Sequence, residues 1–314
     1  MSYLTGLVSV IIPTYKRSDL LPRAIHSVQG QTYRNIEVLV VNDNVSPDDE
    51  YSQRLYTLID SIDDDRVRLI SQPNHINGAA ARNAGIRDAK GEFIAFLDDD
   101  DYWESEKVEL QVRQLESLGP EWGMVTCLNI LRNKQRIVGA SIPYKDGDIF
   151  MDVLERRIGI GMGSALIRRI ALDDVGYFDE KLTRHQDLQL FANLTSKYKV
   201  KLVRKHLYDI DVSDAQNRPD TVKLQKIKAE YFDSIKTLLD QLSPPQRKRV
   251  FALHDFETSY SFLKSGNKKR GMQMATGILR SPVTTYLAAE RCCRKLFEKK
   301  LYKYSLKKYS GILI

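Results

Sequence analysis

Short apolar runs alternate with amphipathic stretches through the first hundred residues of the chain. The runs have the length and composition of buried strands and cover residues 7–12, 36–41, 67–70 and 93–97. Between them, residues 20–29, a polar stretch after Pro47 and residues 77–89 show helical spacing. Strands and helices in this order predict a parallel, doubly wound α/β sheet. The turns that follow the strands then lie on one rim of the sheet, where such folds bind ligands: residues 13–17, 42–46, 72–78 and 98–101.

The last of these strands ends in four consecutive carboxylates, Asp98 to Asp101. Adjacent carboxylates repel one another unless a cation or a hydrogen-bond donor offsets their charge. Mg²⁺ and Mn²⁺ prefer a few carboxylates together with phosphate oxygens. The pattern therefore indicates either a metal and nucleotide site or a solvated acidic turn, in which an Asp caps a helix that begins near Glu104.

Residues 219–314 have a different character. Four segments with helical spacing are separated by Pro and Gly pairs, at residues 222–242, 244–264, 268–279 and 283–309. Residues 221–314 hold 20 Lys and Arg against 7 Asp and Glu, a net charge of +13, which leaves −6 for the rest of a chain whose total is +7. An acidic first part and a basic helical second part are the natural division.

The last segment surrounds an apolar stripe with Lys and Arg. The stripe comprises Cys293, Leu296, Phe297, Leu301 and Tyr304. Such a basic amphipathic helix is typical of proteins that contact an anionic membrane surface. A helical bundle packed on the first part, with a solvated basic face, is the alternative. No aromatic platform or nucleic-acid-binding motif accompanies the charge, so nucleic acid is not an expected partner.

Length and composition limit the class of protein further. A chain of 314 residues can form one large domain with an appendage, or two domains. It has no run of about 18 apolar residues, and its first residues lack the basic region of a signal peptide. Three cysteines provide neither a disulfide framework nor a metal-binding spacing. We therefore expect a protein of the reducing cytoplasm.

Several segments together resemble the family 2 glycosyltransferases, which have the GT-A fold. The resemblance extends over about residues 7–212, with the motifs in the order of the family. They are VSVIIPTYKR at 8–17, VVNDN at 40–44, GAAARNAG at 78–85, FLDDDD at 96–101, and VGYFDE at 175–180 followed by HQDL at 185–188.

The resemblance implies a GT-A (Rossmann-like) α/β fold with a doubly wound mixed sheet and a C-terminal basic helical region. The catalytic domain would cover residues 1–218, with a nucleotide-sugar half at about 1–102 and an acceptor half at about 103–218, followed by basic helices at 219–314. The implied activity is inverting, metal-dependent transfer from a UDP-sugar to a hydroxyl of a glycan or lipid-linked acceptor. Bacterial surface polysaccharide or lipopolysaccharide synthesis, at the cytoplasmic face of the inner membrane, is the implied setting.

Donor-binding roles follow from the same resemblance. Pro13, Thr14 and Tyr15 are expected to line the base and ribose. Asp43 is expected to accept the uracil N3–H, although Asn-Asp-Asn at this position is also good chemistry for an ordinary turn. Arg82 sits on a small-residue helix and would pair with the donor diphosphate or with the acid cluster.

Within the acid cluster, the resemblance assigns different roles to successive carboxylates. Asp98 is expected to contact the ribose hydroxyls, and Asp99 occupies the variable position of the motif. Asp100 is the expected ligand of Mn²⁺ or Mg²⁺. Asp101 would support the metal site or cap the following helix.

Asp187 is the candidate catalytic base, because a carboxylate at this position can take the proton of the attacking acceptor hydroxyl. The alternative is an acid that merely favours the N-terminus of a helix. His185 would orient the acceptor, hold a phosphate or cap that helix. Gly163 and Ser164 are expected at the start of a strand near the acceptor, or in a flexible linker.

Two other activities remain to be separated from glycosyl transfer. A sugar nucleotidyltransferase of related fold would need a Gly-rich basic signature near the first strand, and residues 13–17 are not one. A nucleotide-sugar binding protein without turnover would not need both Asp100 and Asp187. Loss of transfer without loss of donor binding in Asp187→Ala would exclude this second alternative.

Overall fold

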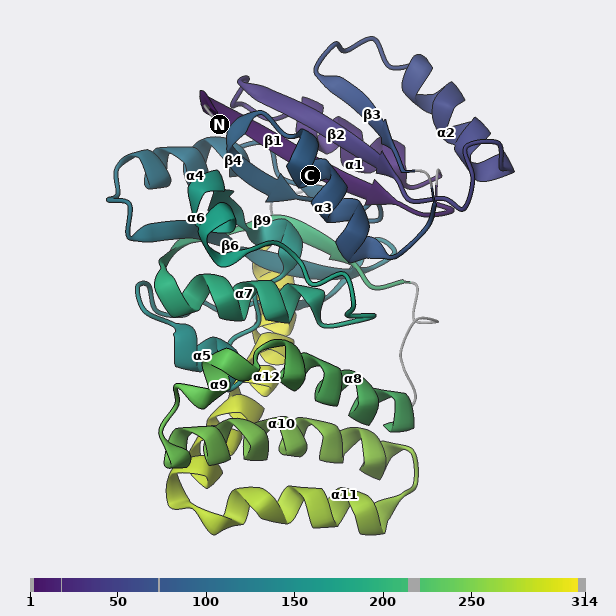
Figure 1. Ribbon diagram of the computed structural model, residues 1–314. Coiled ribbons are helices and arrows are strands. Elements are labelled where there is room, and N and C mark those ends of the chain that lie inside the picture. Colours follow the sequence, from purple (N-terminus) through teal and green to yellow (C-terminus); the bar gives the residue numbers. More distant parts are fainter. Residues whose placement is uncertain (1–2, 18, 73, 214–220, 310–314) are drawn as a thin grey trace.

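The computed structural model describes residues 3–17, 19–72, 74–213 and 221–309. The elements of the first part form one mixed sheet with helices on both faces (Figure 1). Four parallel strands form one side of the sheet: β1 (Leu4–Thr14), β2 (Ile36–Asn42), β3 (Val67–Ser71) and β4 (Gly91–Phe96). These strands occur where the apolar runs predicted them, and their parallel pairing confirms that part of the expectation.

The other side of the sheet mixes strand directions. It contains β5 (Tyr102–Trp103), β6 (Trp122–Asn133), β7 (Arg136–Ala140), β8 (Leu166–Arg168) and β9 (Lys199–Asp211). The strand order is β3-β2-β1-β4-β8-β6-β9-β5, and β7 pairs with β6. Strand β8 is antiparallel to β4, whereas β6 and β9 are parallel to each other. The sheet is therefore mixed, as the expected fold class requires.

Helices cover both faces of the sheet because side chains alternate along each strand. In β1, Val8, Val10 and Ile12 lie in one core and Ile11 lies in the other. The first core also receives α1 (Leu21–Gln29), α2 (Glu50–Asp60) and α4 (Lys107–Glu116). The second receives α3 (Gly78–Asp88), α5 (Phe150–Leu154), α6 (Arg169–Val175) and α7 (Gln186–Lys197).

Helix α3 lies unusually close to the sheet. A Cβ atom on Gly85 would meet Cγ2 of Ile11 at 2.5 Å, which is closer than van der Waals contact allows. The small residues of α3 thus permit this approach, and Asn77 caps the helix by accepting hydrogen bonds from the N–H groups of Ala79 and Ala80. This cap defines the N-terminal end of α3, which begins at Gly78.

One sequence expectation at this rim is wrong. The helix expected near Glu104 begins at Lys107, and Tyr102 and Trp103 form the short strand β5 instead. Asp101 therefore does not cap the helix. The register of β5 with β9, in which Trp103 lies opposite Tyr208, explains the difference, because a strand partner 105 positions away leaves no local signal.

The C-terminal region is helical and packs on the first part. It contains α8 (Thr221–Ser234), α9 (Lys236–Asp240), α10 (Pro244–Lys264), α11 (Lys268–Ala275), the 3₁₀ turn η2 (Thr276–Arg280) and α12 (Pro282–Tyr309). Tyr231 of α8 and Ile235, the N-cap residue of α9, share a buried apolar cluster with Leu154 of α5 and Leu188 of α7. Helix α12 runs back toward the sheet, where Arg294 donates to the carbonyl of Ile142 at 2.8 Å (Figure 1).

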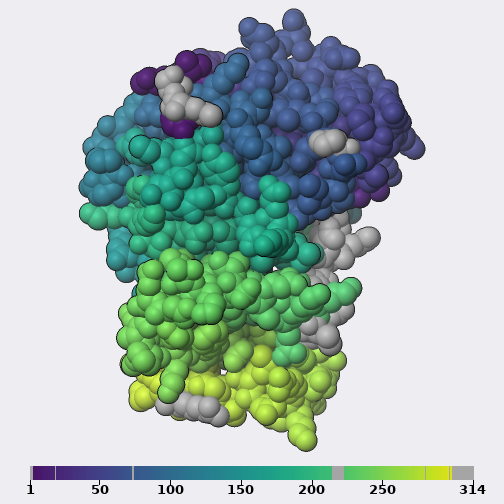
Figure 2. Space-filling model, viewed as in Figure 1, coloured from purple at the N-terminus to yellow at the C-terminus, as the bar shows by residue number. Residues whose placement is uncertain are grey.

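Figure 2 shows the C-terminal helices, green to yellow, as the lower part of the molecule. The boundary expected after Arg218 lies outside the described residues, and so do the side chains of Phe297, Leu301 and Tyr304 from the expected apolar stripe. Within the ranges described above, none of the helices is long and apolar enough to cross a membrane.

Candidate active site

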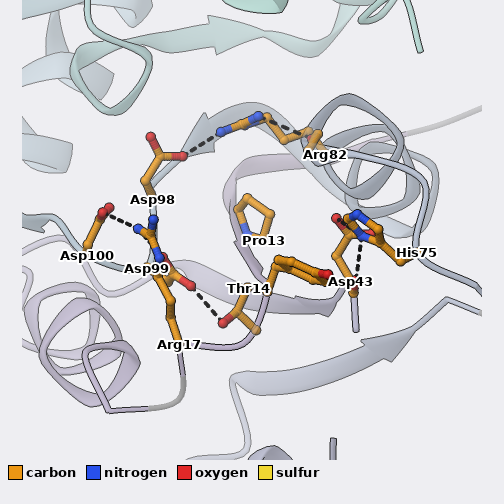
Figure 3. Close-up of a pocket in the computed structure, with 11 residues that line it drawn as sticks. Pro13, Thr14, Arg17, Asp43, His75, Arg82, Asp98, Asp99 and Asp100 are labelled. Carbon is orange, nitrogen blue, oxygen red and sulfur yellow. Dashed lines mark hydrogen bonds and ion pairs between the residues drawn. The ribbon is translucent and has the colours of Figure 1, made fainter. Parts of the chain in front are cut away.

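Two neighbouring strands bring the first turn and the acid cluster together. Because β1 and β4 are paired in parallel, Pro13 and Thr14 at the end of β1 lie beside the carboxylates that follow β4 (Figure 3). The Thr14 hydroxyl donates to Oδ2 of Asp99 at 2.8 Å. Burial raises the pKa of Asp99 to about 7, although the bond from Thr14 opposes the shift.

Asp43 is buried directly after β2, and Asp43 and Tyr15 line the same cavity. His75 Nδ1 lies 3.1 Å from Oδ2 of Asp43, and Gln72 donates to its Oδ1 at 3.2 Å. The rings of Tyr15 and His75 stack with centroids 4.1 Å apart. Burial raises the pKa of Asp43, and His75 opposes this shift. Sequence reasoning missed His75, although the turn after β3 that contains it had been identified.

The other carboxylates of the cluster pair with arginines. Arg82 of α3 donates to Oδ1 of Asp98 at 2.5 Å and to the carbonyl of Gly78 at 3.2 Å. Arg17, which the sequence had not singled out, forms an ion pair with Asp100. Burial and the charge of Asp98 raise the pKa of Asp100, and Arg17 lowers it. Asp98 and Asp100 are thus each paired with an arginine from another turn or helix of the chain.

Asp101 has a different environment from its neighbours. It accepts hydrogen bonds from the hydroxyl of Tyr208 and, at 2.9 Å, from the backbone N–H of Asp211. Burial and the charge of Asp98 raise its pKa well above the ordinary value. Asp101 therefore ties the acid cluster to β9, a role that only the tertiary pairing of distant strands could define.

The residues of the cluster suit a divalent cation by their chemistry. Asp98 and Asp100 supply hard oxygen ligands, and their mutual repulsion favours a bound cation. Within the described ranges no group of three His, Cys, Asp or Glu forms a complete metal site. A Mg²⁺ or Mn²⁺ ion that shares its ligands with substrate phosphates needs only one or two carboxylates, so this donor set fits such an ion.

Two cavities meet at the acid cluster. The first, of about 400 Å³, is lined by residues of the first turn, by Asp43, His75 and Gly78, and by Arg82 and Asp98 to Asp100 (Figure 3). The second, of about 660 Å³, contains Asp187 and His185 from the start of α7 and Leu224 and Ile227 from α8. Arg82, Asp98 and Asp100 line both cavities. Asp187 and the acid cluster thus line neighbouring cavities.

His185 and Asp187 occupy the N-terminal end of α7. His185 has φ 62°, in the left-handed region, and its side chain makes no capping hydrogen bond. The expectation that it caps the helix is therefore wrong. Burial lowers the pKa of His185 to about 4, against the opposing charge of Asp187. The imidazole is consequently neutral at physiological pH.

Gly163 and Ser164 do not occupy the position expected for them. They belong to the buried 3₁₀ turn η1 (Met162–Ser164), and β8 begins only at Leu166. Gly161 and Met162, rather than Gly163 and Ser164, line the second cavity. The carbonyl of Gly163 accepts a hydrogen bond from Trp103 Nε1 at 2.8 Å. This turn is a packed support for the site and not an exposed linker.

Known proteins share the sequence and the architecture described above. The profile of glycosyl transferase family 2 matches residues 9–176, which is more than half of the chain. Two Escherichia coli enzymes named UDP-Glc:α-D-GlcNAc-diphosphoundecaprenol β-1,3-glucosyltransferase are similar: WfaP is 40% identical over 112 residues, and WfgD is 30% identical over 174 residues. These matches cover 35% and 54% of this chain, and 42% and 64% of the relatives, so the chain spans less than two thirds of either.

Solved structures share the fold at low sequence identity. Staphylococcus aureus TarS 1–349 in complex with UDP-GlcNAc has a TM-score of 0.55 and 16% identity, over 95% of this chain and 92% of that one. The mannosyltransferase PcManGT from Pyrobaculum calidifontis, in complex with GDP-Man and Mn²⁺, has the same TM-score and identity over 93% and 86% of the two chains. The family profile, the curated relatives and the shared architecture lead to one conclusion: this chain belongs to glycosyltransferase family 2, and its fold is GT-A.

Proposed function

We propose that this protein transfers a sugar from a UDP-sugar to a hydroxyl of a lipid-linked saccharide, with inversion at the anomeric carbon. The observation that carries the proposal is the wall shared by the two cavities. Arg82, Asp98 and Asp100 line both the cavity that contains Asp43 and the cavity that contains Asp187. A donor diphosphate at this wall would have the nucleotide on one side and the acceptor on the other.

The reaction follows from this arrangement. Asp187 takes the proton of the acceptor hydroxyl as that oxygen attacks the anomeric carbon. The new carbon–oxygen bond forms as the bond to the β-phosphate breaks, and UDP departs with the bonding electron pair. Attack from the side opposite the diphosphate inverts the configuration. Arg82 is placed to offset charge that develops on the leaving group, which is electrostatic catalysis.

Uridine is the proposed base because of Asp43. A buried carboxylate is a hydrogen-bond acceptor, and the uracil N3–H is the donor that distinguishes uracil from cytosine. Tyr15, stacked on His75 beside Asp43, offers an aromatic face to a base or ribose. The names of WfaP and WfgD, which are UDP-Glc enzymes, support the same choice. The fold itself also accepts GDP-Man in PcManGT, so the base needs a direct test.

A divalent cation is part of the proposal. Asp100, with Asp98, would hold Mn²⁺ or Mg²⁺, and the ion would offset charge on the diphosphate. The names of WfaP and WfgD support a lipid-linked acceptor. The proposed setting is surface polysaccharide synthesis at the cytoplasmic face of a bacterial membrane. We retain residues 1–218 as the catalytic domain and 219–314 as the basic helical region.

Peripheral membrane contact through the C-terminal helices completes the proposal. Large apolar side chains are exposed there, namely Tyr260, Met272, Leu279, Val283, Tyr286 and Leu296. Exposed Lys268 and Lys269 lie in the same region. Apolar and basic side chains together favour binding to an anionic bilayer.

A thermal-shift panel with UDP, GDP, CDP and ADP, each with and without Mn²⁺, tests the donor and the metal. A ligand that binds only the folded state raises the melting temperature. We expect a Mn²⁺-dependent shift with UDP that is lost in Asp100→Ala. Asp187→Asn should retain the UDP shift and lose transfer, which a radiolabelled UDP-sugar assay measures. A panel without any nucleotide shift would overturn the proposal.

A further inference from the structure

A buried group of cations lies where the C-terminal helices meet the catalytic part. We define the cation cluster as Arg156, Lys228 and Arg291, which surround Glu257. Lys228 Nζ lies 3.0 Å from Glu257 Oε2, Arg291 Nη2 lies 2.8 Å from Oε1, and Arg156 Nη2 lies 3.7 Å from Oε1. Arg156 lies in the turn after α5, and Lys228, Glu257 and Arg291 come from α8, α10 and α12. Three cations against one carboxylate leave two positive charges in the cluster.

This charge is largely removed from water. Lys228 and Arg291 each retain 7% of their accessible surface, whereas the Arg156 and Glu257 side chains retain 23% and 26%. Burial alone would raise the pKa of Glu257, but the three cations hold it well below its usual range. Burial lowers the pKa of Lys228, and the charges of Arg156 and Arg291 add to that shift although Glu257 opposes it. The single carboxylate therefore does not balance the cluster.

Several buried polar atoms in and beside the cluster have no hydrogen-bond partner among the described residues. They are Nε of Arg156, Nη1 of Arg291, the hydroxyl of Tyr231, and Nδ1 of both His185 and His254. The two guanidinium atoms and the hydroxyl can donate. A buried donor without a partner costs about 1–3 kcal/mol, so unpaired donors beside excess positive charge point to a missing anion.

None of the three cations lines the cavity that contains the candidate base, but residues next to them on α8 do. Lys228 follows Ile227, which lines this cavity, and Tyr231 lies one turn further along α8. The Tyr231 ring packs edge-on against His185, with centroids 5.9 Å apart, and stacks on His254 at 5.7 Å. His185 lines the cavity two positions before Asp187. The charges of Arg156 and of Asp187 both act on the Tyr231 hydroxyl, so the cluster and the base lie near each other.

We propose that the cation cluster binds the diphosphate that links the acceptor saccharide to its lipid carrier. In the acceptor named for WfaP and WfgD, a single GlcNAc on diphosphoundecaprenol, the diphosphate and the attacked hydroxyl belong to the same sugar. With such an acceptor the anion must lie within one sugar ring of the base. The inference rests on the proposed function, because it assigns an acceptor group to the cavity of Asp187. It adds a role for the C-terminal helices: α8, α10 and α12 would supply the acceptor's anion site rather than only pack on the catalytic part.

Kinetics with two matched acceptors test this site in the full-length protein. One acceptor is GlcNAc α-linked to dodecyl diphosphate, and the other is dodecyl α-GlcNAc, which has no phosphate. Arg291→Met removes one cation and an unpaired donor. Arg294→Met is the control, because Arg294 lies one turn later on α12 and donates to the carbonyls of Ile142 and Pro143 instead.

We expect Arg291→Met to raise KM for the diphosphate acceptor about 10- to 100-fold. This factor corresponds to the binding free energy that a hydrogen bond to a charged group usually contributes. KM for dodecyl α-GlcNAc and for the UDP-sugar should change less than about two-fold, and Arg294→Met should resemble the wild type with both acceptors. Equal changes with the two acceptors, or no change with either, would overturn the proposal.

A direct binding measurement separates this inference from the proposed function. With UDP saturating and Mn²⁺ in excess over all added phosphates, inorganic pyrophosphate should raise the melting temperature of the wild type and of Arg294→Met, and not of Arg291→Met. Absence of a shift in the wild type would refute the anion site while leaving UDP binding and transfer to dodecyl α-GlcNAc intact. Pyrophosphate could bind although the wild type has the same KM for both acceptors. In that case the site binds free pyrophosphate, and its assignment to the acceptor is wrong.

A second variant covers the case in which Arg291→Met does not fold. Arg156→Gln changes the more exposed cation of the cluster and should give the same selective rise in KM. Because the apo cluster holds excess positive charge, neither variant should lower the melting temperature of the apo protein by more than Arg294→Met does. A large loss of apo stability in Arg156→Gln, with unchanged selectivity between acceptors, would mean that the cluster is only an ion-pair network that joins helices.

Discussion

Tyr15 and His75 stack face to face, with ring centroids 4.1 Å apart and an interplanar angle of 19°, at the wall of the cavity that contains Asp43. The two residues come from the turns after β1 and β3, which lie on either side of β2 in the sheet. The stack therefore links two strand ends across the one that supplies Asp43. This relationship connects the two turns that flank Asp43 at the wall of the cavity.

Asp43→Asn should change the choice of nucleotide. An Asn amide can donate to N3 of cytosine, whereas a carboxylate can only accept from N3–H of uracil. We expect UDP to bind about 10- to 100-fold more weakly and CDP to bind more tightly than in the wild type. Isothermal titration with both nucleotides measures this. Asp48→Asn, an exposed carboxylate in the same turn, is the control for charge. An unchanged preference for UDP would show that Asp43 does not contact the base.

Gly163→Ala should disturb the acid cluster from a distance. A Cβ atom at this position would meet the Tyr208 ring at 2.5 Å, and the Tyr208 hydroxyl bonds to Asp101. Overpacking of this kind costs about 1–3 kcal/mol of folding free energy. We expect lower stability by urea denaturation and a lower kcat. Gly159→Ala should change neither quantity, because nothing lies within 4 Å of its added Cβ. Equal behaviour of the two variants would contradict the assigned packing.

Lys107 should make stability depend on pH. It is fully buried against the Trp103 ring, 3.7 Å from the centroid, and donates to Gln111 at 2.8 Å. Burial lowers its pKa from 10.5 to about 8, so the charged form costs about 3 kcal/mol in the folded state. Between about pH 8 and pH 10.5 the unfolded chain keeps the proton that the folded chain has lost. This contribution to stability therefore rises with pH across that window.

Lys107→Met isolates this contribution. The free energy of unfolding, measured with urea at pH 7, 8.5 and 10, should favour the variant most at pH 7 and progressively less at higher pH. The exposed Lys248, changed to Met, should give a difference from the wild type that is independent of pH. A constant difference between Lys107→Met and the wild type would refute the assignment.

Vesicle binding tests the proposed membrane contact. We expect the protein to sediment with vesicles that contain an anionic lipid and not with neutral vesicles, and the bound fraction should fall as salt is added. Replacement of exposed Tyr260, Met272, Leu279 and Tyr286 by Ser should reduce binding without lowering the melting temperature. If the protein binds anionic and neutral vesicles equally well, and if the Ser variant binds like the wild type, the proposed membrane contact of the C-terminal helices is wrong.

Local patterns were sufficient for strands β1 to β4, for the helices between them and for most of the first cavity. The apolar runs at β1 to β4 are long enough to be buried, and parallel pairing places the turns after them on one rim. Pro13 to Tyr15, Asp43, Arg82 and Asp98 to Asp100 all line the first cavity. These residues could be predicted because each lies at or just after the end of a strand, or in the first two turns of a helix, so its position depends on nearby sequence.

Contacts between distant segments could not be predicted in this way. The pairing of β5 with β9 moved Asp101 from a helix cap to a partner of Tyr208, and the loop after β1 supplied Arg17 to Asp100. Packing of α8 against α7 brought Tyr231 to His185. The amino-acid pattern defined which elements form and which rim they expose, since hydrophobic periodicity and turn chemistry are local. The partners of each buried charge depended on the folded chain, because burial and Coulomb interactions act between side chains that are near in space regardless of their separation in sequence.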